Sequence, residues 1–130
     1  MTPRFKVSAK EDRTADGVVF DSKGEMTRYL DLKLAEKAGV IRDLILQCDF
    51  VVPINDKHFC TYTADFSYID VVADKIIYED VKSTGTAKDA AYRLRKKAVE
   101  LYYGVKITEF LVGWKPKKKK KWIRPPRQVI

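Results

Sequence analysis

The sequence predicts an α/β protein of the α+β kind, in which helices flank a central mixed β-sheet. Apolar residues recur at helical spacing in two stretches, residues 22–38 and 87–103. The stretch between them is rich in β-branched and aromatic residues and is interrupted by short turn signals, which is typical of strands. A mixed sheet covered by helices is the simplest architecture for elements in this order.

The first expected elements are a hairpin and a helix. Asp16-Gly17, followed by three apolar residues, is a two-residue hairpin signal. Ser22 followed three residues later by Glu25 fits a capping box, so a helix should begin there. Gly39 stands where that helix should end.

Four strands are expected after the first helix, at residues 50–52, 60–72, 75–83 and 105–112. The second and third are joined by a tight turn at residues 73–74. The last of the four is so apolar that we expect it to be largely buried.

The second helix is expected over residues 87–103 and should end at Gly104. Leu94, Ala98 and Leu101 fall on one side of this helix and form its expected apolar face. Tyr92 and its neighbours one turn apart lie on the other side, which could face a site, a nucleic acid, the core or a second copy.

The positive charge is concentrated at one end of the chain. Of the net +8, all comes from residues 114–130, which hold eight basic residues and no acid, while residues 1–113 balance 18 basic with 18 acidic residues. We therefore expect one folded domain at residues 1–113 and a basic tail at residues 114–130 that can bind phosphates. No apolar run approaches the ~18 residues of a membrane helix, so we expect a cytoplasmic protein with no membrane partner.

The segment that points to chemistry lies in the third expected strand. Because side chains alternate along a strand, Asp80 and Lys82 share one face and Val81 takes the other. Such a pair alone could be a surface ion pair worth ~0 to 1 kcal/mol. A second acid, Asp65, sits inside the preceding aromatic-rich strand, where an acid is costly unless something offsets its desolvation. A magnesium ion held by the two acids would do so.

These residues resemble the PD-(D/E)XK nuclease superfamily. The likeness extends to a phage-encoded branch, similar to Holliday-junction resolvases, whose members are often described only as a domain of unknown function. It covers residues 12–112, and the residues that carry it are Asp65 and the segments 20–25, 28–30, 32–34, 39–41, 44–47, 79–82 and 92–103.

The resemblance implies a restriction-endonuclease-like core and a set of roles. Asp65 and Asp80 would bind Mg²⁺ or Mn²⁺, Val81 would add its backbone carbonyl, and Lys82 would be the catalytic lysine. Glu25 would be the additional acid that many members place near the metal. The capping box explains Glu25 without any metal, and the two explanations are compatible.

Residues that could bind nucleic acid come from the second helix and from the tail. They are Tyr92, Arg93, Lys96, Lys117, Lys118, Lys119, Lys120 and Lys121. The helix residues have a packing or solvated-surface alternative, and the tail has solubilising or targeting alternatives.

The expected function is therefore a Mg²⁺- or Mn²⁺-dependent endonuclease that hydrolyses DNA, with branched or duplex DNA as its partner. A body this small favours recognition of DNA structure over a long sequence, in phage recombination, replication or processing. If the chain is phage-encoded, it would act in the host cell cytoplasm, and related resolving enzymes often work as homodimers. The alternative is a non-catalytic nucleic-acid-binding protein that uses the basic tail.

Overall fold

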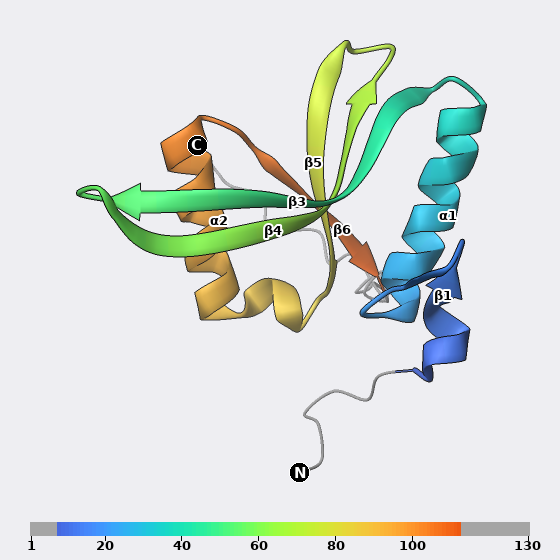
Figure 1. Ribbon diagram of the computed structural model, residues 1–130, viewed down its shortest axis with the longest axis horizontal. Helices are drawn as coiled ribbons and strands as arrows, with labels where there is room; N and C mark the ends of the chain where they lie inside the picture. Colours follow the sequence, from blue (N-terminus) through green and yellow to red (C-terminus); the bar gives the residue numbers. More distant parts are fainter. Residues whose placement is uncertain (1–7, 113–130) are drawn as a thin grey trace, which may run out of the picture.

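The structure of the protein is a computed structural model that describes residues 8–112. The described residues form two α-helices, which lie on opposite sides of the molecule in Figure 1, with the strands of one sheet crossing between them. The elements in chain order are η1 (Lys10–Arg13), β1 (Thr14–Ala15), β2 (Val18–Val19), α1 (Lys23–Lys37), β3 (Ile41–Ile54), β4 (Lys57–Asp70), β5 (Lys75–Ser83), η2 (Thr86–Lys88), α2 (Ala90–Tyr103) and β6 (Ile107–Val112). No helix in this part of the chain is long and apolar enough to cross a membrane.

The main sheet has the order β3-β4-β5-β6 and is mixed, as the sequence predicts. β3 pairs with β4 and β4 with β5 in antiparallel fashion, whereas β5 and β6 are parallel. The parallel pair requires a crossover, and η2 and α2 supply it. The α+β architecture of a mixed sheet and two helices is thus confirmed.

The N-terminal hairpin and the first helix form where the sequence predicts them. β1 and β2 are joined at Asp16 and Gly17, and both residues have the positive φ that such a turn requires. Ser22 caps α1 by accepting a hydrogen bond from the amide of Glu25 at 3.0 Å. After the helix, Gly39 adopts φ 79°.

β3 is far longer than the strand expected at residues 50–52. It begins at Ile41, and the missed part contains two residues with positive φ, Asp43 and Gln47, together with a register shift after Arg42. These irregularities break the alternation of side chains by which a strand is predicted. Long β3 and β4 form a hairpin that reaches past α2 in Figure 1.

β4 and β5 run together only over part of their length. Their pairing extends from Asp70 with Lys75 to Phe66 with Glu79. Beyond that point β4 pairs only with β3, while β5 pairs with β6. The two central strands therefore separate at Asp65 on β4 and Asp80 on β5, directly beyond the pair of Phe66 and Glu79. This separation positions the site.

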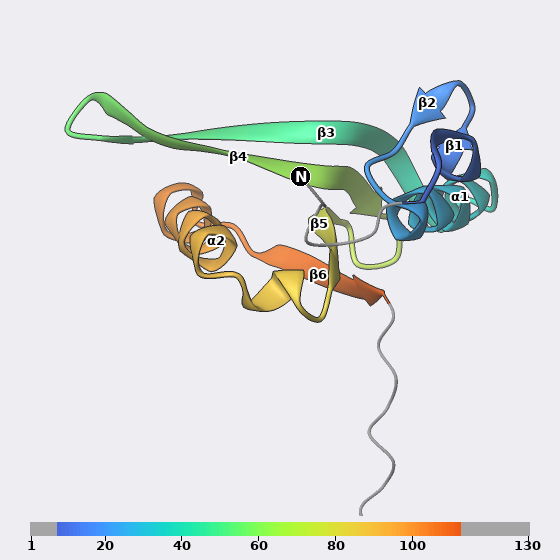
Figure 2. The ribbon, with the colours of Figure 1, turned by 90° about the horizontal axis from the view of Figure 1, so that it is seen from below.

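The core has two clusters, one beside each helix. Figure 2 shows α1 beside the start of the β3–β4 hairpin and α2 beside its outer half. The cluster beside α1 consists of Phe20, Tyr29, Leu32, Ile41, Phe66, Tyr68 and Val81. The cluster beside α2 consists of Phe50, Val52, Tyr62, Ala64, Tyr92, Val99 and Ile107.

Two expectations about the second half of the fold are wrong. Leu94 and Leu101 were the expected apolar face of α2, but they are 60% and 73% exposed, and the buried face carries Tyr92 and Val99. The strand at residues 105–112 was expected to be largely buried, but β6 is the edge strand of the sheet and only its Ile107 is buried. In both cases apolar character alone did not identify which side meets the rest of the protein.

Candidate metal-binding and catalytic site

Asp65 on β4 and Asp80 on β5 meet where these two strands separate. The amide of Asp65 donates a hydrogen bond to Oδ1 of Asp80 at 3.3 Å. The amide of Val81 donates to Oδ2 of Asp65 at 2.9 Å. The two carboxylates thus accept hydrogen bonds from backbone amides that would otherwise pair β4 with β5. The structure brings the two acids together, as the sequence predicts.

Lys82 lies two residues beyond Asp80 on β5. Its ammonium group lies 4.7 Å from the centroid of the Tyr92 ring, which comes from α2. Burial raises the pKa of both Asp65 and Asp80, and the positive charge of Lys82 opposes this rise, so the lysine and the two acids are electrostatically coupled.

Glu25 is brought to the same place by the first turn of α1. Its backbone amide is used by the Ser22 cap, but no reciprocal bond from the Ser22 amide to the Glu25 carboxylate exists among residues 8–112. The side chain is 5% exposed and lines the cavity beside Asp65. Glu25 therefore occupies the cap position and also faces the site.

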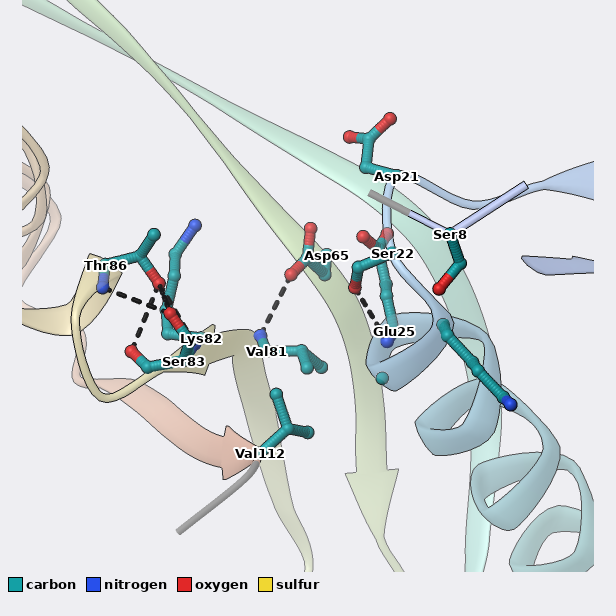
Figure 3. Close-up of a pocket in the computed structure, with 12 residues that line it drawn as sticks. Ser8, Asp21, Ser22, Glu25, Asp65, Val81, Lys82, Ser83, Thr86 and Val112 are labelled. Atoms are coloured by element: carbon teal, nitrogen blue, oxygen red, sulfur yellow. Dashed lines mark hydrogen bonds between the residues drawn. The ribbon is translucent and has the colours of Figure 1, made fainter. Parts of the chain in front are cut away.

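A cavity of about 560 Å³ lies between α1, β4, β5 and the loop after β5. Figure 3 shows the carboxylates of Asp65 and Glu25 close to one another at this cavity, with Lys82 on its other side. The residues that line it are Ser8, Asp21, Ser22, Lys23, Gly24, Glu25, Asp65, Val81, Lys82, Ser83, Thr86 and Val112. Asp80 is not part of this lining and is only 1% exposed.

The acids of the site are held close together in a poorly solvated place. Burial, together with the charges of Asp65 and Asp21, raises the pKa of Glu25 to about 7. Burial is also the main reason why the pKa values of Asp65 and Asp80 are raised. Ionised carboxylates are disfavoured here, so an added positive charge would stabilise them.

A divalent cation would supply such a positive charge. Oδ2 of Asp80 is buried and has no hydrogen-bond partner among the described residues. Between residues 8 and 112, no group of three or more His, Cys, Asp or Glu residues is placed so that it could hold a metal ion by itself. Two carboxylates would be enough for an ion such as Mg²⁺, which uses a few carboxylates and keeps several waters.

A family model described as a protein of unknown function (DUF1064) matches residues 4–120. The chain belongs to the DUF1064 family. Comparisons with curated proteins and with solved structures found no match. The family assignment covers the cavity and every residue predicted for the metal and catalytic roles of this DUF1064 protein, and it assigns no activity to them.

Glu79 of this DUF1064 protein points away from Asp80, as strand alternation predicts. Its carboxylate accepts hydrogen bonds from Arg28 on α1 and from Tyr68 on β4. Glu79 thus belongs to the α1 side of the sheet and not to the cavity.

The α2 residues predicted to bind nucleic acid differ in their surroundings. Tyr92 is 5% exposed and packs in the core beneath Lys82. It therefore has the packing role that was the alternative to nucleic-acid binding. Lys96 forms an ion pair with Glu109 at 2.8 Å, and Arg93 is exposed beside it. The five tail lysines, Lys117 to Lys121, lie outside the described residues.

Asp21, Ser83 and Thr86 are among the cavity residues that carried no predicted role. Asp21, directly before the α1 cap, raises the pKa of Glu25 by its charge. The hydroxyl groups of Ser83 and Thr86 lie 2.8 Å apart at the other end of the cavity. The signal for this pair was the hydroxyl-rich run Ser-Thr-Gly-Thr directly after Lys82.

Proposed function

We propose that this protein is a metal-dependent endonuclease that hydrolyses DNA phosphodiester bonds. One observation supports this most: Asp65 and Asp80 meet where β4 and β5 separate, beside Lys82 and Glu25. The resemblance to the PD-(D/E)XK superfamily concerns these same positions. The finer assignment, to the phage resolvase-like branch, is part of the proposal.

Asp65, Asp80 and the Val81 carbonyl would hold Mg²⁺ or Mn²⁺, and Glu25 would be the additional acid. When bound, the ion would neutralise charge on the phosphate and lower the pKa of a water molecule. The unpartnered Oδ2 of Asp80 and the raised pKa values of the acids support this donor set.

Lys82 would supply the positive charge that belongs to the protein itself. Its ammonium could hold the attacking water by donating a hydrogen bond to it, or stabilise the negative charge that grows on the phosphate oxygens. The ring of Tyr92 limits where the ammonium can lie. Asp65 and Glu25 border the same cavity and could accept a proton from the water.

Branched DNA is the proposed substrate class. The described residues form two α-helices, one four-stranded sheet and one two-stranded hairpin, which leaves little surface for reading a long base sequence. Fold alone does not decide substrate, so this choice is a proposal that needs its own test. The tail at residues 114–130 would add affinity for phosphates of any DNA.

The test is a gel assay with branched and linear DNA in Mg²⁺, Mn²⁺ or EDTA. We expect cutting that requires the metal and is lost in Asp80→Asn and Lys82→Ala, while DNA binding remains. Asp31→Asn and Lys75→Ala change exposed residues away from the cavity and serve as matched controls that keep the activity.

Binding without cutting on every DNA substrate and in every metal would overturn the proposal. The alternative, a non-catalytic nucleic-acid-binding protein, would then hold. Preferential cutting of linear over branched DNA would overturn the substrate class alone.

A further inference from the structure

Arg28 fastens α1 to the sheet. Its Nε and Nη2 donate to the two carboxylate oxygens of Glu79 on β5, each at 2.8 Å. Its guanidinium also lies 4.1 Å from the ring centroid of Phe110 on β6. The hydroxyl of Tyr68 on β4 donates to Glu79 at 2.9 Å. One arginine thus links the helix to two strands, and a tyrosine from a third strand completes the group.

Both partners of this ion pair are neighbours of site residues. Arg28 lies one helical turn after Glu25, and Glu79 directly precedes Asp80. The ion pair itself faces away from the cavity, so it fixes the backbone from which the two acids project. The distance between α1 and β5 at this point sets how near Glu25 can come to Asp80.

A second contact fixes the other side of Glu25. Gly24 packs so closely on Val112 that an added Cβ would lie 3.0 Å from its Cγ2. Glu25 therefore sits between two points where α1 is held against the sheet.

We propose that Arg28 and Glu79 are positioning residues, which set the place of Glu25 relative to Asp65 and Asp80. This inference rests on the proposed metal site. A bidentate pair fixes both direction and distance, and lysine cannot reproduce its two parallel hydrogen bonds. Glu79 is 1% exposed, so it needs this partner.

The first test measures Mn²⁺ binding to the whole protein by calorimetry, without DNA. We expect Arg28→Met to weaken Mn²⁺ affinity by about 10- to 100-fold, as loss of a residue that supports metal ligands does. Arg28→Lys should weaken it less. Lys33→Met, which removes the exposed Lys33–Glu36 pair from the same helix, is the matched control and should leave affinity unchanged.

The second test asks whether Arg28 acts through Glu25. In a double-mutant cycle, Glu25→Gln should weaken Mn²⁺ binding strongly in the wild type but little in the Arg28→Met background. Equal effects of Glu25→Gln in both backgrounds would mean that Arg28 is only structural, and would overturn the inference while leaving the metal site intact.

Circular dichroism must show that each variant is folded at the temperature of the titration. If Arg28→Met does not fold, the cycle is run with Arg28→Lys and with Tyr68→Phe, which removes one of the three bonds to Glu79. If the wild type binds no Mn²⁺, the proposed function and this inference are both overturned. If the wild type binds Mn²⁺ but the two mutations have additive effects, only this inference is overturned.

Discussion

The ammonium of Lys82 lies 4.7 Å from the centre of the Tyr92 ring. The hydroxyl of the same tyrosine is buried and has no hydrogen-bond partner among the described residues. Lys82 therefore contacts the ring and not the hydroxyl. A cation over an aromatic face is held electrostatically, and more firmly when water is excluded.

The ring of Tyr92, and not its hydroxyl, should matter for Lys82. We expect Tyr92→Phe to keep metal-dependent DNA cutting and to match or exceed the wild type in stability, because it removes a buried unpartnered hydroxyl. Tyr92→Leu should lower kcat, since Lys82 loses a contact worth about 0.5–2 kcal/mol. Single-turnover cleavage and urea unfolding measure the two effects. Equal kcat values for the two variants would contradict this role.

Mn²⁺ should stabilise the folded protein. An ion that binds only the folded state adds about 2.7 kcal/mol at 100 times its Kd. We expect Mn²⁺ to raise the Tm of the wild type and of Asp31→Asn, but to have little effect on Asp80→Asn. Thermal unfolding with Mn²⁺ and with EDTA gives the comparison. An equal rise in Tm for Asp80→Asn would show that the ion binds elsewhere.

Without metal, the contribution of Glu25 to stability should fall as the pH rises from about 4.5 towards 7. The pKa of Glu25 is raised from 4.5 to about 7, so the folded state holds this proton more tightly than the unfolded chain. Above pH 7 Glu25→Gln should be more stable than the wild type by roughly 1 to 3 kcal/mol, and near pH 4.5 the difference should vanish.

Glu36 provides a control of opposite sign. A hydrogen bond from the Leu44 amide and the nearby Lys33 lower the pKa of Glu36. Its stabilising contribution is present above the unfolded pKa and lost as pH falls, so Glu36→Gln should destabilise the protein at neutral pH. Urea unfolding in EDTA across this range measures both variants. A Glu25→Gln variant that tracks the wild type at every pH would refute the raised pKa.

The close contact of Gly24 with Val112 should appear as coupling between the two residues. Alanine favours a helix over glycine by up to about 1 kcal/mol, but its Cβ would press on Val112. We expect Gly24→Ala to be more favourable in the Val112→Ala background than in the wild type by about 0.5–1 kcal/mol. Additive unfolding free energies would show that Val112 moves aside at no cost.

The sequence predicted those parts of the fold that local chemistry determines. The first helix, with its Ser22 cap and the Gly39 end, follows from side chains that act on their own backbone. The same is true of the Asp16–Gly17 turn. Only residues 50–52 of β3 were predicted, and its first part was missed because the irregular residues there are held in the strand by pairing with β4, which no local pattern reveals.

The site shows the same division. Strand alternation placed Asp80 with Lys82 and turned Glu79 away from them. It could not show that Tyr92 lies under Lys82, or that Arg28 meets Glu79 from 51 positions away, because both contacts depend on how helices dock on the sheet. The Lys82–Tyr92 and Arg28–Glu79 contacts could be found only from the three-dimensional structure.

The carboxylates of Asp65 and Asp80 each accept a hydrogen bond from a backbone amide, and this affects the choice of substitutions. Each carboxylate fills a place in the backbone bonding pattern at the fork of β4 and β5. Truncating either residue to alanine would remove a charge and also leave a backbone amide without its hydrogen-bond acceptor. Lost activity could then come from local distortion of β4 and β5 as much as from altered chemistry. Asparagine keeps an oxygen acceptor of the same shape, which makes it the cleaner substitution at both positions.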